Sequence, residues 1–232
     1  MSKTARFLVV ALFAAAMAWV ESAVVLYLRL MIDRIQPYQV DPLPAFARLG
    51  EAELIREAAT LVMLLCIGWL AGAHLRQRLG YAMLAFGIWD IFYYIFLVPL
   101  SSWPNSLLDW DILFLIPLPW WGPVLAPTSI ALLMVVAGAL ISGLDLWPRS
   151  SSWLASYCGA ALVLYAFMVD ALRALPSGLQ AVRYVLPIEF NWPLFALGWA
   201  LMALPVADMV WQSFNLHWRE EPLQSISLHD LS

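Results

Sequence analysis

Several ionisable side chains lie within long apolar runs of the sequence, where a charge is costly. Glu21 and Asp90 each fall inside such a run, and Arg29 follows Glu21 by about two helical turns. Arg56 and Glu57 stand at the start of another run. A charge at the centre of a membrane span costs about 2.5–3.5 kcal/mol, so such residues usually face a protein interior and have a partner. They are therefore candidates for a polar site.

Two tyrosines and a further acid extend this set. Tyr93 and Tyr94 follow Asp90 at positions i+3 and i+4, so at least one of them shares its helix face. Asp111 lies in the next connection. Carboxylates, arginines and tyrosines together could hold a polar head group or relay protons. The predicted ligand-binding residues are Glu21, Arg29, Arg56, Glu57, Asp90, Tyr93, Tyr94 and Asp111.

A purely structural role for these residues is an open alternative. Glu21 or Asp90 could pair with an arginine and so lock the helices together. Asp170 and Arg173 are most simply explained as an i,i+3 pair near a helix end. Carboxylates alone suit Mg²⁺, Mn²⁺ or Ca²⁺, but no histidine accompanies them, and we expect no metal site. No phosphate loop or Ser/His/Asp nucleophile is recognisable, and the sequence specifies no cofactor.

The elements that carry these residues follow from composition. The chain has 232 residues, of which 63% are hydrophobic and 12% charged. Soluble domains carry about 45–50% apolar and about 25% charged residues, so much of this surface must face lipid. The net charge of −4 argues against nucleic-acid binding, which needs a basic face. Cys66 and Cys158 lie in apolar runs, and we expect buried, unreactive thiols.

Six apolar runs are long enough to cross a bilayer, which takes about 20 helical residues. We therefore expect an all-α polytopic bundle that forms a single integral membrane domain, with a polar C-terminal tail over residues 215–232. The second span extends back to Glu51 if its acids occupy a first helical turn. The first run could be a cleaved signal peptide, but its apolar character continues to Leu28, which favours a span. The predicted spans lie near residues 7–28, 57–73, 80–100, 124–144, 153–172 and 193–214.

The segment 107–127 is rich in tryptophan and contains four prolines, which disfavour a continuous helix. We expect a short interfacial or re-entrant helix there, followed by a broken start to the fourth span. Because consecutive spans alternate in direction, Glu21, Glu57 and Asp111 fall in the same half of the membrane, with Asp90 just below them. This placement predicts a polar pocket that opens towards the first-loop side.

Orientation follows only from the distribution of basic residues. Each side of the membrane would hold six lysines or arginines in total, but the short turn before Gly80 carries two arginines. The connection between the third and fourth spans carries none. Short loops dominate the positive-inside bias, so we expect both termini in the cytoplasm.

Several motifs resemble a group of uncharacterised bacterial multi-pass inner-membrane proteins. They are Trp89-Asp90-Ile91-Phe92-Tyr93-Tyr94, Trp103-Pro104, Trp110-Asp111, the segment 117–123, Glu21 before Tyr27-Leu28-Arg29, and the segment 56–60. The resemblance covers roughly the first 140 residues and implies a bacterial inner-membrane location. It implies no activity.

Three classes of function remain open at this point. The first is a non-catalytic protein that binds a polar lipid or a quinone-like small molecule, or an accessory subunit that contacts other membrane subunits. The second is an intramembrane enzyme acting on a lipid or isoprenoid, with Asp90 and Glu21 as general acid and base. The third is a small-molecule or proton-coupled transporter.

Overall fold

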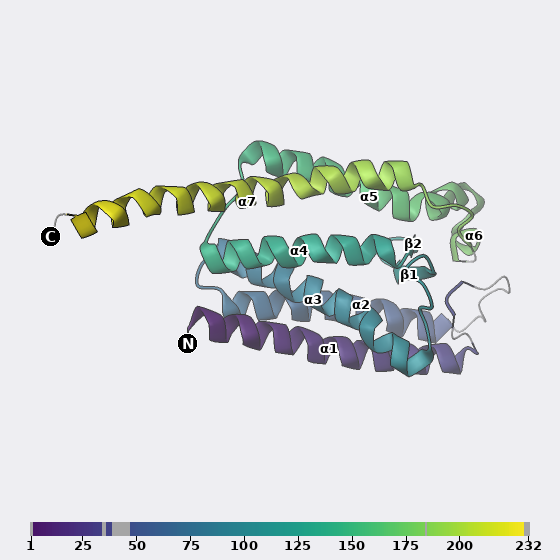
Figure 1. Cartoon of the computed structure of the whole chain (residues 1–232). Coiled ribbons are helices and arrows are strands. Elements are labelled where there is room, and N and C mark those ends of the chain that lie inside the picture. Colours follow the sequence, from purple (N-terminus) through teal and green to yellow (C-terminus); the bar gives the residue numbers. More distant parts are fainter. Residues whose placement is uncertain (1, 34–35, 39–46, 184, 230–232) are drawn as a thin grey trace.

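The computed structural model describes residues 2–33, 36–38, 47–183 and 185–229. Long helices dominate the described chain, together with one small two-stranded sheet (Figure 1). The long helices are α1 (Lys3–Met31), α2 (Ala47–Ala71), α3 (Leu75–Ser101), α4 (Leu125–Leu144), α5 (Ser150–Ala174) and α7 (Trp192–His229). Two short helices, η1 (Leu175–Ser177) and α6 (Leu179–Arg183), follow α5.

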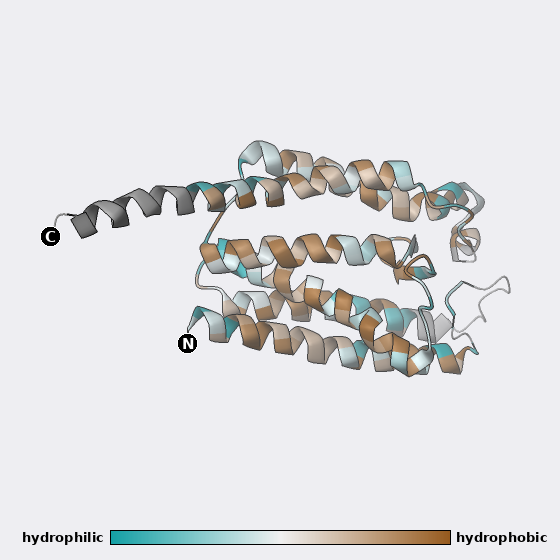
Figure 2. Ribbon diagram, viewed as in Figure 1, coloured by the Kyte–Doolittle hydropathy of each residue, from teal (hydrophilic) through white to brown (hydrophobic). Residues whose placement is uncertain are grey.

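Six helices are long and apolar enough to span a membrane, which confirms the predicted all-α polytopic architecture. Hydrophobic residues predominate along the middle of these helices, and hydrophilic residues gather towards their ends (Figure 2). The second helix begins earlier than expected, at Ala47, so Glu51 and Glu53 do not occupy its first turn. Glu57 consequently lies well inside α2, and not at its start. The helix α7 continues beyond the span that ends at Asn215.

The helices form two groups. In the first group, α3 packs against α1, α2 and α4. In the second, α5 pairs with α7, and the two approach closely where Gly159 faces the backbone of Gly198. The groups meet through contacts of α7 with α4 and of α5 with the sheet (Figure 1). The boundary between the two groups is therefore thinly packed compared with the groups themselves.

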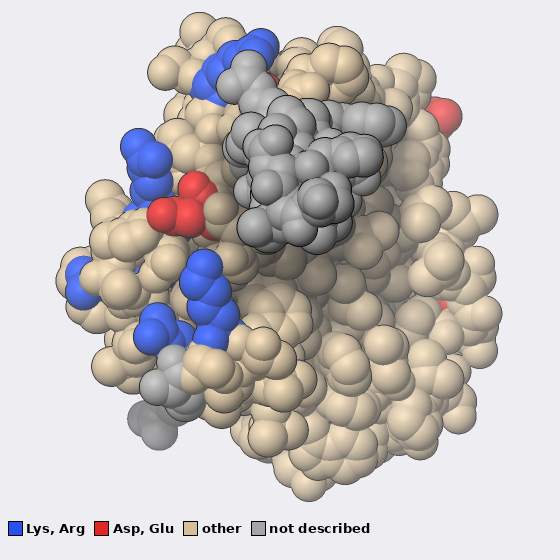
Figure 3. Space-filling model, turned by 60° about the vertical axis from the view of Figure 1, so that its left-hand side comes forward, with Lys and Arg blue, Asp and Glu red and all other residues tan. Residues whose placement is uncertain are grey.

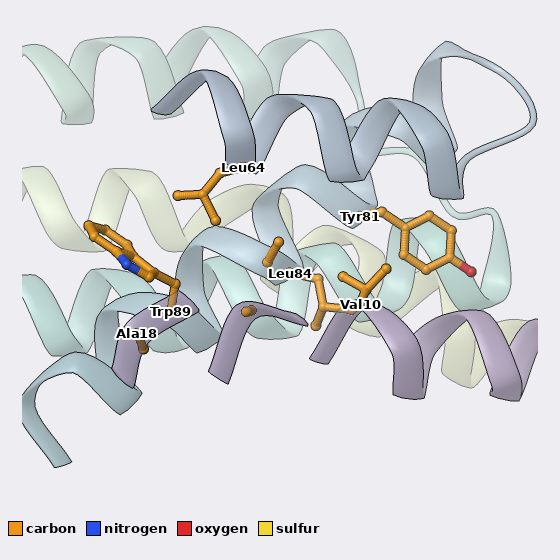
Figure 4. Packing of buried hydrophobic residues seen from close by; sticks show 8 residues of the cluster. Val10, Ala18, Leu64, Tyr81, Leu84 and Trp89 are labelled. Carbon is orange, nitrogen blue, oxygen red and sulfur yellow. The ribbon is translucent and has the colours of Figure 1, made fainter. Parts of the chain in front are cut away.

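The core of the first group explains why its helices stay together. Val10 and Ala18 of α1 meet Leu64 of α2 and Leu84 of α3 in one apolar cluster, seen in Figure 4. Small residues also let α3 and α4 come close. A Cβ atom added to Gly138 would lie 2.6 Å from the carbonyl oxygen of Gly80. Dispersion contacts of this kind, without a hydrophobic driving force, hold membrane helices together.

The segment between α3 and α4 corrects the sequence prediction. Where we expected a short helix, β1 (Trp110–Phe114) pairs antiparallel with β2 (Trp120–Pro123). The prolines remove backbone donors that a helix would need, whereas the hairpin pairs its donors and acceptors between strands. The broken start of the fourth span is also wrong, because α4 is continuous from Leu125. Its Pro127 sits in the first turn, where a missing N–H costs little.

The cysteines also differ from expectation. Cys66 and Cys158 are both exposed on the surface of spanning helices, and no disulfide involves them. A cysteine side chain is apolar enough to face lipid. The position of these cysteines in apolar runs therefore did not indicate that they are buried inside the protein.

Candidate functional site

A cavity of about 490 Å³ lies where the two helix groups and the hairpin meet. Residues from α1, α2, α3, α4, α5, α7 and the hairpin line it. Every residue predicted for ligand binding is among them: Glu21, Arg29, Arg56, Glu57, Asp90, Tyr93, Tyr94 and Asp111. The predicted convergence of acids from separate spans on one cavity is thus present in the structure.

The Asp111 carboxylate on β1 is the centre of one buried network. Arg29 donates from Nη2 to Asp111 Oδ1 at 3.1 Å, and the Tyr94 hydroxyl donates to Oδ2 at 3.1 Å. The backbone N–H of Ile112 adds a third donor at 2.9 Å. Asp111 is 2% exposed and Arg29 7%. The Arg29 guanidinium also lies 4.3 Å from the centre of the Trp103 ring. Through Arg29, Tyr94 and Asp111, this network connects α1, α3 and the hairpin.

Burial raises the pKa of Asp111 above its ordinary range, because an apolar environment penalises the charged form. The Arg29 guanidinium, the Tyr94 hydroxyl and the Ile112 N–H oppose that rise. The charge on Asp111 therefore depends on its partners.

A second network joins α1 to α2. The Arg56 guanidinium forms ion pairs with Glu21 of α1 and with Glu53, one turn earlier on α2. Its Nε donates to Glu53 Oε2 at 2.9 Å. The Thr60 hydroxyl donates to Glu21 Oε2 at 3.3 Å. The intramembrane acid Glu21 is thus neutralised by a cation from the neighbouring helix, as the cost of an isolated charge requires.

Glu57 connects α2 to the hairpin. Both of its carboxylate oxygens accept from the backbone N–H of Leu115, at 3.1 and 3.0 Å. Leu115 follows directly after β1, so this contact fixes the turn of the hairpin over the cavity. Glu57 is 6% exposed. Its role in the structure is to hold this turn.

Four buried polar atoms of cavity-lining residues have no hydrogen-bond partner among the described residues. One of them, Nη1 of Arg56, is engaged in the ion pair with Glu21. The other three are Oδ2 of Asp90, Nε1 of Trp89 and Nε1 of Trp120. Asp90 is 9% exposed. Buried polar groups normally have a partner, and each exception calls for an explanation. A bound ligand is one such explanation.

The part of the cavity lining that comes from α4, α5 and α7 is apolar. It includes Ile130, Ala131 and Met134 of α4, Ala160, Val163, Leu164 and Phe167 of α5, and Met202 of α7. The charged lining comes from α1, α2, α3 and β1. The cavity is therefore amphipathic, because α4, α5 and α7 contribute only apolar side chains to it.

Some polar residues in the same half of the membrane lie outside the cavity. Asp170 and Arg173 form the expected i,i+3 ion pair, at 3.6 Å, with Arg173 largely exposed. Asp109 accepts from the backbone N–H groups of Asn105 and Ser106. The side chain of Arg183 is outside the described residues.

Sequence reasoning missed four contributors: Glu53, Thr60, Trp89 and Trp120. Helical spacing could have found two of them. Glu53 precedes Glu57 by four residues, and Thr60 follows Arg56 by four, so these residues share a face of α2. Trp120 could not be placed without the hairpin.

Within the described residues, no group of three or more His, Cys, Asp or Glu side chains is arranged to hold a metal ion. The carboxylates that line the cavity are instead spaced among arginines and backbone donors. No family model, curated protein or solved structure matches this chain. The resemblance to bacterial membrane proteins stays a prediction, and the functional argument rests on the geometry of the cavity.

Proposed function

We propose that this multi-pass membrane protein binds an amphipathic small molecule in the cavity between its two helix groups. The polar head of the molecule would lie among Asp90, Trp89 and the hairpin, and its apolar part along α4 and α5. The observation that carries this proposal is the division of the cavity lining into charged residues from α1, α2, α3 and β1 and purely apolar residues from α4, α5 and α7. The volume of the cavity is about 490 Å³. Small-molecule sites typically have volumes of about 300–1,000 Å³.

The test is to identify what copurifies with the protein. The protein is extracted with native lipid into nanodiscs, and bound amphiphiles are identified by mass spectrometry. Ala160 belongs to the apolar lining, so Ala160→Trp fills that part of the cavity and should remove the bound molecule. Leu154→Trp, on the exposed face of the same helix, is the matched control and should leave it in place. Identical amphiphile content in both variants and the wild type would contradict the proposal.

A second candidate is an intramembrane enzyme that uses a carboxyl group as an acid or base. One observation favours it: Asp90 is a buried carboxyl in the cavity whose Oδ2 has no partner among the described residues. A group held in this way is available to a substrate. The test compares the lipid profiles of cells that express the wild type and cells that express Asp90→Asn. If the protein is an enzyme, its substrate should accumulate in the cells with the variant. Unchanged profiles with unchanged ligand content would leave only the binding role.

No specific observation favours transport. Transport sites are usually built on broken helices near the midplane, whereas each of the six described spans is a long α-helix without a break near its middle; the fifth only ends in η1.

The proposed location is the bacterial inner membrane, with both termini in the cytoplasm. Lys and Arg side chains gather at the end of the molecule where the termini lie (Figure 3). At the other end, Arg29 and Arg56 are held in ion pairs within the cavity. Among the side chains that the structure describes, Lys3, Arg76 and Arg149 are exposed at the end with the termini, against Arg173 at the other end. This excess supports a cytoplasmic placement of the termini.

A further inference from the structure

We infer that the ligand head group is uncharged and bears a hydroxyl group: a long-chain or isoprenoid alcohol and not its phosphate. This inference rests on the proposed function and narrows the class of amphiphile that the cavity accepts. Two independent features of the lining lead to it, the balance of charge and the set of unpartnered polar atoms.

The charge balance disfavours an anionic head group. The lining contains five carboxylates, Glu21, Glu53, Glu57, Asp90 and Asp111, and two arginines, Arg29 and Arg56. Both arginines are already engaged, Arg29 by Asp111 and Arg56 by Glu21 and Glu53. A phosphate placed here would have to break one of these ion pairs and would lie near excess negative charge. Sites that recognise phosphate use arginine or lysine side chains for it.

The unpartnered atoms require both a donor and an acceptor from the ligand. Asp90 Oδ2 needs a donor, whereas Trp89 Nε1 and Trp120 Nε1 need an acceptor. A hydroxyl group supplies one donor and two acceptor lone pairs. It therefore offers in one group both the donor that Asp90 needs and the acceptor that an indole needs.

Other head groups satisfy only part of this set. A quinone carbonyl accepts but cannot donate, so the ionised Asp90 carboxylate would stay unpartnered. An ammonium group donates but cannot accept, so it would match the acids and leave both indoles unpartnered. Leaving a buried polar group without a partner costs affinity, so the alcohol is the head group that the three atoms favour.

The experiment compares three probes with the same apolar chain: geranylgeraniol, geranylgeranyl phosphate and geranylgeranylamine. Saturable binding of each radiolabelled probe to the full chain in nanodiscs is measured, with Ala160→Trp as the blocked control. We expect the alcohol to bind at least about tenfold more tightly than either charged probe. Tightest binding of the phosphate or the amine would overturn the head-group inference and leave the proposed function standing. Absence of saturable binding for all three would overturn both.

Variants then locate the head group. Trp89→Phe keeps the ring but removes the N–H, and Asp90→Asn keeps the shape but weakens the acceptor. Each should weaken geranylgeraniol binding by about three- to tenfold, as expected for one hydrogen bond. Trp153→Phe is the matched control, because Trp153 also has an unpartnered buried indole N–H but does not line the cavity. Wild-type affinity in correctly folded Trp89→Phe and Asp90→Asn would overturn the inference.

Discussion

Among the described residues, the Arg29–Asp111 pair is the most completely buried ion pair, and its two members come from elements far apart in sequence. Removing one partner of such a pair leaves an uncompensated buried charge, which costs about 3–5 kcal/mol. We therefore expect Arg29→Gln to lower the free energy of unfolding by that amount. Unfolding in mild detergent, followed by circular dichroism, measures the loss.

The matched control for this variant is Arg173→Gln. Arg173 also pairs with an aspartate, at 3.6 Å, but its side chain is 73% exposed. Exposed pairs contribute no more than about 1 kcal/mol, so this variant should unfold almost as the wild type does. Equal destabilisation by the two substitutions would contradict a structural role for the buried pair.

The same pair predicts how stability depends on pH. The pKa of Asp111 is raised by burial, and Arg29 is the largest opposing influence. Without Arg29, the folded pKa rises further above the unfolded value of about 3.9, so the folded state binds more protons and stability falls as pH rises. We expect Arg29→Gln to lose more stability at pH 8 than at pH 5. The second substitution Asp111→Asn should abolish this difference between the two pH values.

At this scale the sequence predicted which residues meet but not how they pair. Depth in the membrane follows from position along a span, so Glu21, Asp90 and Asp111 could be assigned to one level. Partner choice depends on which helices are neighbours, which depth does not determine. Hence Arg29 pairs with Asp111 of the hairpin, and Glu21 with Arg56 of α2.

Among the elements, the hairpin depends on α2 for its position. Glu57 accepts from Leu115 with both oxygens, so Glu57→Ala should release the turn after β1 while leaving the spans intact. We expect faster hydrogen exchange at residues 112–116, measured by mass spectrometry. Glu51→Ala, an exposed acid on the same helix, should leave that exchange unchanged. Unaltered exchange in Glu57→Ala would show that the strands alone hold the turn.

The contact between α3 and α4 depends on small residues. A Cβ at Gly138 would meet backbone atoms of α3 at 2.6 Å, which cannot move without separating the helices. Gly138→Ala should therefore destabilise the protein, by about 1–3 kcal/mol as for overpacking in a core. Gly143→Ala, in the same helix with nothing within 4 Å, should be neutral or stabilising by up to about 1 kcal/mol. Detergent unfolding of the pair of variants measures the difference.

The spanning helices were predictable and the hairpin was not, for one physical reason. Crossing hydrocarbon imposes a length and an apolar composition on each helix, and both can be read from a single segment. A strand at the membrane surface is specified by its partner, so the pairing of Trp110 with Pro123 has no local signature. The prolines showed only where a helix could not continue.

At the scale of the whole molecule, the cavity exists only because the two helix groups pack against each other. The helices α1, α2 and α3 and the strand β1 supply the charged lining, and α4, α5 and α7 supply the apolar lining. The cavity lies where the two helix groups meet. Neither group alone would enclose a ligand. Orientation decides which side of the membrane the charged lining faces, and therefore from which compartment a polar head group would be reached.

If the termini are cytoplasmic, the charged lining and the loop after α3 face the opposite side. Cys66 and Cys158 are first replaced by alanine to remove background labelling. Leu107→Cys, at an exposed loop position, should then react with a membrane-impermeant maleimide in right-side-out vesicles. Ser2→Cys, at the exposed start of α1, should react only after the vesicles are opened. The reverse pattern would place the termini outside, and the excess of exposed cations that the described residues show beside them would then oppose the positive-inside bias.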